Sequence, residues 1–269
     1  MKNKIIIGAS QYGARVNIDH SLKIIKFLFN NNFKFFDTAP LYGCGLSHFI
    51  FNRTKKKNLI TTKIGQPLKL SLLEILKRIY RFNSLENFFF SFKHFYFDKR
   101  KKKKFWSKKN LELIINEYEK EMPNNIIKSI YFHRPPHKLI DKKILSDFIN
   151  LSKNKKFLPG ICNISSKNLG IIKNKTLTLQ IDIKFYLKYY NKIKNLSNPL
   201  EIFGLFTFIK DLDDKSLNDK KKFKSFFKKK ILKNNNVKIL IPINNMNRAK
   251  QLVSEVKNKS YFEKILRKI

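Results

Sequence analysis

The chain has only two cysteines among its 269 residues, Cys44 and Cys162. A disulfide framework or a cysteine-based zinc site needs more cysteines at closer spacing, so neither is available here. The scarcity of cysteine fits a reducing compartment. His20, His48 and His94 are scattered without metal-ligand spacing, and His137, which lies close to His133, is interpreted as a loop histidine. We therefore expect no metal site.

Long hydrophobic runs are also missing. No stretch approaches the roughly 20 apolar residues that a membrane span needs. The closest one, 88–97, is short and contains Lys93 and His94. The N-terminal apolar run that ends before Gly8 is too short for the core of a signal peptide, and we interpret it as a buried first strand. These features predict a soluble, cytoplasmic protein without a membrane partner.

Acidic residues are few: 19 Asp and Glu stand against 58 Lys and Arg, which gives a formal net charge of +39. Such a balance normally indicates a nucleic acid or an anionic surface as partner. Lys, Asn, Ile and Phe are in excess together, however, and all four have A/T-rich codons. Compositional drift explains this joint bias, and the one dense lysine block, 99–104, fits a solvated loop. We expect no specific nucleic-acid partner.

What the sequence does contain is a repeated alternation of short apolar, β-rich runs with segments of helical periodicity. Strands that alternate with helices indicate parallel βαβ units. Eight such units in about 250 residues match a (β/α)8 or TIM barrel. An open doubly wound sheet would usually carry a GxGxxG turn after its first strand, and GASQYG is not one. The predicted strands are Lys4–Gly8, Lys34–Thr38, Leu59–Lys63, Ser129–His133, Phe157–Asn163, Thr176–Ile183, Glu201–Phe208 and Val237–Ile243.

We treat residues 1–269 as a single barrel domain with one long insertion at about 66–107, which lacks a clear strand. Within the insertion, 72–80 is a predicted helix, and the aromatic run 88–97 either covers the barrel mouth or packs on its flank. The other predicted helices are 21–29 with Asp19 as its N-cap, 109–121, 144–153, 219–232, 247–257 and 261–269.

Four residues with acid–base side chains lie at or just beyond the ends of three predicted strands: Asp37, Tyr42, Lys63 and His133. Taken singly, each fits a structural role, such as a turn residue for Asp37. Their joint placement favours one site, because a TIM barrel carries its active site at the C-terminal ends of the strands.

The four side chains also make a coherent chemical set. A tyrosine with a pKa near 10 is a poor acid at neutral pH, but a close ammonium lowers that pKa and a carboxylate holds the ammonium in place. A neutral imidazole can orient a carbonyl group. The set suits carbonyl reduction or alcohol oxidation, with the hydride supplied by a cofactor.

Six segments of the chain resemble the aldo-keto reductases, in order and spacing, from Gly8 to about Gln251. They are FFDTAPLYGCGLS (35–47), LITTKIG (59–65), YFHRPP (131–136), LPGICNIS (158–165), LTLQIDI (177–183) and ILIPINN (239–245). The DTAPLYGxGLS form is most similar to the sugar-oxidising branch, the fucose and galactose dehydrogenase-like proteins. The resemblance implies a (β/α)8 barrel that binds NADP or NAD without a Rossmann fold.

The resemblance also implies roles for the four residues. Tyr42 would be the general acid/base and Lys63 the partner that lowers its pKa. Asp37 would pair with Lys63, and His133 would orient the carbonyl. The implied substrate is a small carbonyl compound or sugar, and the implied activity is that of an NAD(P)-dependent oxidoreductase. The alternative is a barrel that binds the nucleotide but acts only as a regulatory or scaffold protein.

Further residues would hold the cofactor by the same resemblance. Around the nicotinamide, Asn163 and Gln180 would bond the carboxamide, Cys162 stands where the family usually has Ser, and Phe203 would stack on the ring. The residues at the adenosine phosphates would be Asn244, Asn245, Arg248 and Gln251. Arg248 beside a 2′-phosphate favours NADP, with NAD as the alternative.

Two departures from the family pattern concern structure more than chemistry. Where the family has S-E-x-x-x-G after the tyrosine, this chain has Ser47-His48-Phe49-Ile50-Phe51, without the usual glutamate and glycine. Both changes fall on the short second helix, where they concern its packing. Leu205 stands near the position of an arginine that is common in the sugar-oxidising branch.

Overall fold

The structure is a computed structural model that describes residues 2–40, 42–65, 106–135, 142–172, 176–258, 260–267 and 269. The helix expected at 72–80, the aromatic run 88–97 and the lysine block 99–104 lie outside the described residues. So does most of the insertion expected at about 66–107.

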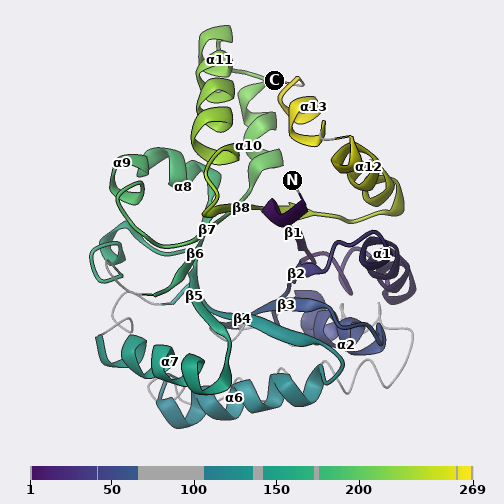
Figure 1. Ribbon diagram of the computed structural model, residues 1–269, viewed down its shortest axis with the longest axis vertical. Helices are drawn as coiled ribbons and strands as arrows, with labels where there is room; N and C mark the ends of the chain where they lie inside the picture. Colours follow the sequence, from purple (N-terminus) through teal and green to yellow (C-terminus); the bar gives the residue numbers. More distant parts are fainter. Residues whose placement is uncertain are drawn as a thin grey trace, which may run out of the picture.

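Eight parallel strands form a closed barrel in which each strand pairs with its neighbours in sequence, and β8 pairs with β1 (Figure 1). This confirms the predicted (β/α)8 fold and all eight predicted strands. The strands are β1 (Ile5–Gly8), β2 (Phe35–Asp37), β3 (Leu59–Gly65), β4 (Ile126–His133), β5 (Leu158–Cys162), β6 (Thr178–Asp182), β7 (Leu200–Phe203) and β8 (Val237–Pro242).

The helices pack around the barrel (Figure 1). They are α1 (Ile18–Asn30), α2 (Leu46–Arg53), α6 (Lys108–Glu121), α7 (Lys142–Lys155), α8 (Ile183–Lys188), α9 (Tyr190–Ile193), α10 (Leu205–Leu212), α11 (Leu217–Phe226), α12 (Met246–Lys257) and α13 (Tyr261–Arg267). A π-helical turn, Phe227–Leu232, continues α11, and short 3-10 turns cover Lys2–Lys4, Tyr42–Gly45 and Ser166–Asn168.

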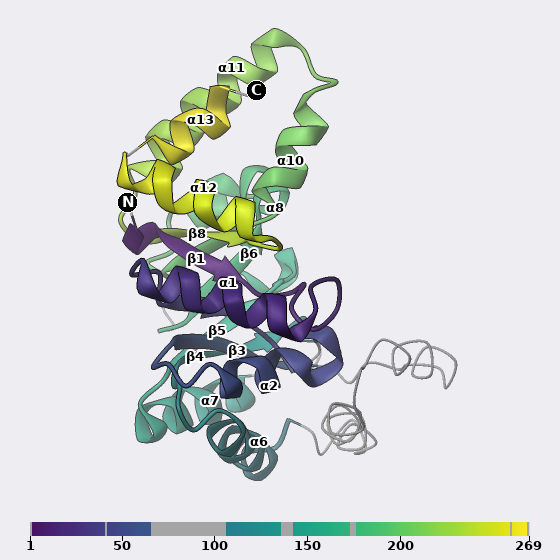
Figure 2. The same cartoon turned by 90° about the vertical axis from the view of Figure 1, so that its right-hand side faces the viewer.

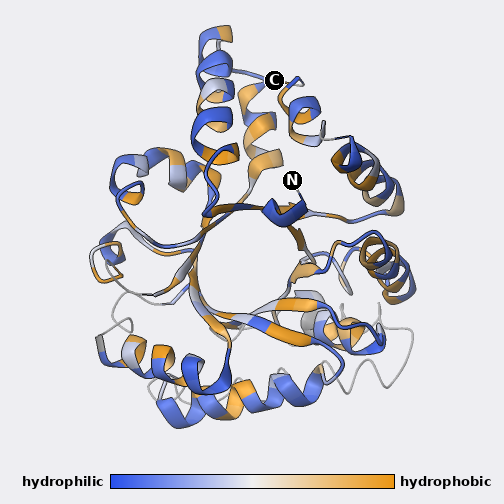
Figure 3. Cartoon of the chain, in the orientation of Figure 1, coloured by the Kyte–Doolittle hydropathy of each residue, from blue (hydrophilic) through white to orange (hydrophobic). Residues whose placement is uncertain are grey.

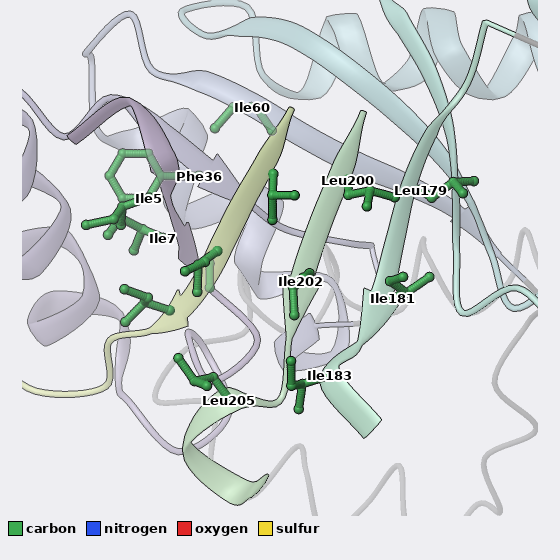
Figure 4. Packing of buried hydrophobic residues seen from close by; sticks show 14 of the residues in the cluster. Ile5, Ile7, Phe36, Ile60, Leu179, Ile181, Ile183, Leu200, Ile202 and Leu205 are labelled. Carbon is green, nitrogen blue, oxygen red and sulfur yellow. The ribbon is translucent and has the colours of Figure 1, made fainter. Parts of the chain in front are cut away.

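The core consists mainly of branched aliphatic and aromatic side chains from the strands and from the inner faces of the helices. Ile7, Phe36 and Leu179 are fully buried, and Figure 4 shows how such residues pack along neighbouring strands. Polar colours cover much of the outer surface of the helices in Figure 3. The strands are therefore buried on both faces, one toward the barrel interior and one toward the helices. Burial on both faces explains why the strands are apolar runs without a clean alternation of apolar and polar residues.

The start of α1 differs from the prediction. The N-cap is Asn17, not Asp19, because the Asn17 side chain accepts a hydrogen bond of 2.8 Å from the backbone N–H of His20. The helix then begins at Ile18, so Asp19 lies in its first turn. A carboxylate in that turn is favourable beside the helix dipole without capping it.

The seventh strand is shorter than the predicted Glu201–Phe208. It ends at Phe203, and Gly204 adopts a left-handed conformation with φ of 80°, after which α10 begins at Leu205. The residues that follow form the buried face of a helix instead of continuing the strand. A short apolar run fits either structure, so periodicity alone misplaced this boundary.

Helices α10 and α11 extend away from the barrel body in Figure 2. None of the described helices is both long and apolar enough to cross a membrane.

Candidate active site

A buried ion pair lies at the C-terminal end of β2 and β3. The Lys63 ammonium donates to both carboxylate oxygens of Asp37 at 2.6 Å, and to the Thr38 carbonyl at 3.1 Å. Strand register brings the two together, because Asp37 pairs with Thr61 and Lys63 lies two residues further on the same face. Both side chains are almost completely excluded from solvent.

The Lys63 ammonium keeps its charge in this setting. Burial lowers the pKa of Lys63, but the charge of the Asp37 carboxylate and its hydrogen bond with the ammonium act in the opposite direction, and the net shift is upward. Lys63 is not the last residue of its strand as predicted, because β3 continues to Gly65.

Tyr42 reaches the same place from the 3-10 turn after β2. Its ring centroid lies 5.0 Å from the Lys63 Nζ. The next residue, Gly43, has φ of 57°, and a Cβ there would lie 2.4 Å from the Tyr12 carbonyl oxygen. Only glycine allows the turn to approach the loop after β1 so closely.

Burial governs the acidity of Tyr42. It raises the pKa of Tyr42 to about 12, although the Lys63 ammonium lowers this pKa. Asp37 and Cys162 add to the upward shift. The contribution of Lys63 therefore has the predicted sign but does not outweigh burial, and Tyr42 is a neutral phenol around pH 7.

His133 is the last residue of β4, as predicted, and its ring lies edge-on to that of Tyr42 with centroids 6.4 Å apart. Burial, together with the charges of Lys63 and Arg134, lowers the pKa of His133 to about 3. The imidazole is thus neutral at physiological pH. Opposite it on β3 lies Gly65, where a Cβ would come within 3.0 Å of the His133 Cβ.

Two of the predicted nicotinamide contacts lie in one row with His133. His133 pairs with Cys162 on β5, and Cys162 pairs with Gln180 on β6. Asn163 follows Cys162 in a left-handed conformation, and its backbone N–H donates to the Gln180 carbonyl at 2.9 Å. The pKa of Cys162 is raised to about 12, chiefly by burial, so this residue is a neutral thiol.

The Gln180 side chain makes two hydrogen bonds within the protein that the sequence does not predict. Its side-chain nitrogen donates to Asp37 Oδ2 at 2.8 Å and to Glu201 Oε2 at 3.0 Å. Tyr131 Oη in turn donates to the other Glu201 oxygen at 2.8 Å. Sequence reasoning missed Glu201 and Tyr131, although a carboxylate inside a buried strand was an available signal.

Phe203 is the last residue of β7 and pairs with Asp182 at the end of β6. It is half-buried at the same end of the barrel as Asp37 and His133. This position is compatible with the stacking role that was predicted for it.

The predicted phosphate-binding residues lie beyond β8, at the start of α12. Asn245 is the N-cap of α12, because its side chain accepts from the Arg248 backbone N–H at 2.8 Å. Gln251 donates to Glu255 at 2.9 Å. Asn244 precedes the cap and is half-buried. Asn245 and Gln251 thus have structural partners, and the side chain of Arg248 is exposed.

Arg248 and Gln251 line a cavity of about 290 Å³ between α10, α12, α13 and the end of β8. Lys210 and Lys264 contribute two more cations to its wall, while Asp213 and Glu255 contribute carboxylates. A helix N-terminus with neighbouring cations is suited to a phosphate group.

His48, which stands in place of the family's glutamate, has a structural partner of its own. It is fully buried, with Nδ1 3.1 Å from Glu121 Oε2 and Nε2 2.8 Å from Thr62 Oγ1. Glu121 on α6 supplies the carboxylate that α2 lacks. Over the described ranges, no group of three or more His, Cys, Asp or Glu residues could hold a metal ion.

Comparison with solved structures shows the same fold. A glycerol dehydrogenase from Gluconobacter oxydans shares 13% identity and a TM-score of 0.59, with 94% of this chain and 90% of that chain covered. A thermostable aldo-keto reductase in complex with the inhibitor epalrestat shares 11% identity and a TM-score of 0.62, with 94% and 89% covered. The holo form of an aldo-keto reductase from Bacillus halodurans shares 12% identity and a TM-score of 0.62, with 94% and 86% covered.

Sequence comparison identifies the family. No curated protein matches the chain. The sequence model of the Aldo/keto reductase family matches residues 4–154, which is more than half of the chain. The chain therefore belongs to the aldo/keto reductase family of oxidoreductases.

Proposed function

We propose that the protein is an NAD(P)-dependent oxidoreductase that interconverts a carbonyl group and an alcohol, on a small sugar or sugar-like substrate in the cytoplasm. The observation that carries the proposal is the meeting of Asp37, Lys63, Tyr42 and His133 at one end of the barrel. A bound nicotinamide dinucleotide would supply or accept the hydride.

Each of the four side chains has a defined task in this proposal. In the direction of reduction, the Tyr42 phenol donates its proton to the oxygen that becomes the alcohol. The Lys63 ammonium stabilises the phenolate that remains, and Asp37 holds the ammonium in place. The neutral His133 imidazole donates a hydrogen bond that orients the carbonyl oxygen. Oxidation of the alcohol reverses these proton movements.

The cofactor would lie between two groups of residues. Asn163 and Gln180 would bond its carboxamide, Cys162 would make a weaker contact there than a serine would, and Phe203 would stack on the ring. Arg248 and the start of α12 would hold the adenosine phosphates. Because an arginine suits a 2′-phosphate, we propose NADP, with NAD as the second choice.

A thermal-shift comparison of NADPH with NADH tests binding and cofactor choice together. A ligand at 100 times its dissociation constant stabilises the folded protein by about 2.7 kcal/mol. We expect a larger shift of the melting temperature with NADPH. Arg248→Ala should abolish the difference between the two dinucleotides. Equal shifts in the unmodified protein would contradict the preference.

Turnover of a panel of aldehydes and sugars, followed by nicotinamide absorbance, tests the reaction. Tyr42→Phe should lower the rate by about 100-fold or more, because a positioned general acid contributes 10²–10⁴-fold. NADPH binding should persist in this variant. The matched control is Tyr190→Phe, a half-buried tyrosine on α9. Full activity of Tyr42→Phe would refute the mechanism, whereas tight binding without any turnover would favour the regulatory or scaffold alternative.

A further inference from the structure

The side-chain amide of Gln180 lies between two carboxylates inside the barrel. Its nitrogen donates one hydrogen to Asp37 Oδ2 at 2.8 Å and the other to Glu201 Oε2 at 3.0 Å. A primary amide has two N–H donors and one oxygen acceptor. Both donors of Gln180 are therefore used by protein groups, and all three side chains are buried.

This arrangement fixes which way the amide points. Rotating it by 180° about χ3 would place the amide oxygen against two acceptor groups, which is strongly unfavourable in a buried site. The oxygen is consequently held away from both carboxylates. Among the described side chains, none donates a hydrogen bond to this oxygen.

Glu201 is itself held in place from the opposite side. Tyr131 on β4 donates to Glu201 Oε1 at 2.8 Å, so each carboxylate oxygen accepts one bond. The Tyr131 ring lies over Gly160 on β5, where a Cβ would come within 2.3 Å of a ring carbon. These residues belong to no part of the proposed reaction. Their contacts form a chain across β4, β7, β6 and β2 that ends at the Asp37–Lys63 pair.

We infer that Glu201 is a positioning residue, which fixes the Gln180 amide so that its oxygen faces the nicotinamide carboxamide as a hydrogen-bond acceptor. The inference rests on the proposed function, since it concerns the same cofactor site. The carboxamide of nicotinamide carries an N–H₂ donor, which the free Gln180 oxygen can accept, whereas a flipped amide would present N–H groups and could bond only the carboxamide oxygen.

A purely structural role for Glu201 makes a different prediction. In that case the Glu201 carboxylate only accepts a hydrogen bond from the Tyr131 hydroxyl, and Asp37 alone would fix the orientation of the Gln180 amide. Three variants separate the two roles. Glu201→Leu removes both acceptors, Glu201→Gln keeps one acceptor for Gln180, and Tyr131→Phe removes the hydroxyl but leaves the Gln180–Glu201 bond.

The first measurement is NMR of the side-chain amides in protein labelled with ¹⁵N-glutamine. The chain has only four glutamines, so the spectrum is simple. We expect slow hydrogen exchange for the Gln180 amide in the unmodified protein, in Glu201→Gln and in Tyr131→Phe. In Glu201→Leu, exchange should accelerate at least tenfold. Unchanged exchange in Glu201→Leu, or equal acceleration in Tyr131→Phe, would overturn the inference.

The second measurement is a double-mutant cycle on NADPH affinity. We expect Glu201→Leu to raise the dissociation constant about tenfold, as loss of one well-placed hydrogen bond does, and Glu201→Gln to restore most of that loss. In a Gln180→Ala background, Glu201→Leu should have no further effect, because it acts through Gln180. Additive effects would overturn the inference. If the unmodified protein bound neither dinucleotide, the proposed function would fail instead, and the NMR measurement would still decide whether Glu201 positions Gln180.

Discussion

The Lys63 ammonium bonds the Asp37 carboxylate and lies close to the Tyr42 ring. It is fully buried and bonds both oxygens of Asp37. Removing one member of a buried pair leaves an uncompensated charge, whereas removing both leaves none. The two residues should therefore act as a unit in stability measurements as well as in catalysis.

We predict that Lys63→Met destabilises the protein by about 3–5 kcal/mol, the usual loss when one buried partner is removed. The double variant Lys63→Met with Asp37→Leu should recover part of this loss. Urea unfolding followed by circular dichroism measures both. A loss below about 1 kcal/mol in the single variant, the size of an exposed ion pair, would contradict the buried Lys63–Asp37 pair.

His133 makes stability depend on pH in a definite direction. Burial, Lys63 and Arg134 lower its pKa in the folded protein to about 3, while the unfolded chain has a value near 6.5. Between these values the unfolded state binds a proton that the folded state does not. The contribution is therefore complete above about pH 6.5 and is lost as pH falls toward 3.

We predict that the unmodified protein loses stability relative to His133→Gln by about 1 kcal/mol per pH unit below pH 6. The variant has the same carboxylates, so subtracting its curve removes their titration. Chemical unfolding at pH 7, 6 and 5 gives the two slopes. Parallel curves would mean that the pKa of His133 is the same in the folded and the unfolded protein.

Among the elements, the connection from β7 to α10 leaves no room for a side chain at Gly204. Gly204 has φ of 80°, and a Cβ at this position would lie 2.3 Å from Asp182 Oδ2. Asp182 is the N-cap of α8, where its side chain accepts from the Lys184 backbone N–H at 2.8 Å. A side chain at position 204 would thus disturb the start of two helices.

We predict that Gly204→Ala destabilises the protein by about 2–3 kcal/mol, from the strained φ and the displaced cap together. Gly170→Ala is the matched control, because nothing lies within 4 Å of a Cβ there. Guanidinium unfolding should show less than about 0.5 kcal/mol of loss for the control. Equal effects of the two substitutions would rule out the steric account.

The elements were predictable from the sequence to different degrees. Eight apolar runs gave the right number of strands, and His133 ends β4 as expected. The end of β7 was not predictable, because the residues after Gly204 suit a strand or a helix face equally. The pairing of Gln180 with Asp37 joins residues 143 positions apart, and only the register of the closed barrel brings them together. The roles of the site residues stay predictions.

The whole molecule carries far more positive than negative charge. The 58 basic residues outnumber the 19 acidic ones, which leaves a formal net charge of +39. Exposed ion pairs such as Lys184–Asp211 and Lys228–Glu263 relieve only a small part of the repulsion. Several lysines lie on α11, which extends away from the barrel (Figure 2). Self-repulsion of this kind destabilises the compact state.

We predict that raising NaCl from 20 to 200 mM increases the melting temperature by about 2–4 °C, the shift that corresponds to roughly 1 kcal/mol in a chain of this size. Screening of like charges is the cause, so KCl should act equally. Differential scanning calorimetry measures the shift. A melting temperature that falls with salt would show that attractive pairs outweigh the repulsion.

The contact between Gly160 and Tyr131 has a consequence for how the sequence can change. A side chain at position 160 would occupy the space of the Tyr131 ring, which supports Glu201. A larger residue at 160 is therefore tolerated only after residue 131 has become smaller. The substitution at position 131 must therefore come before the substitution at position 160. The order in which substitutions occur, and not only which substitutions occur, thus limits the sequences that this barrel can evolve into.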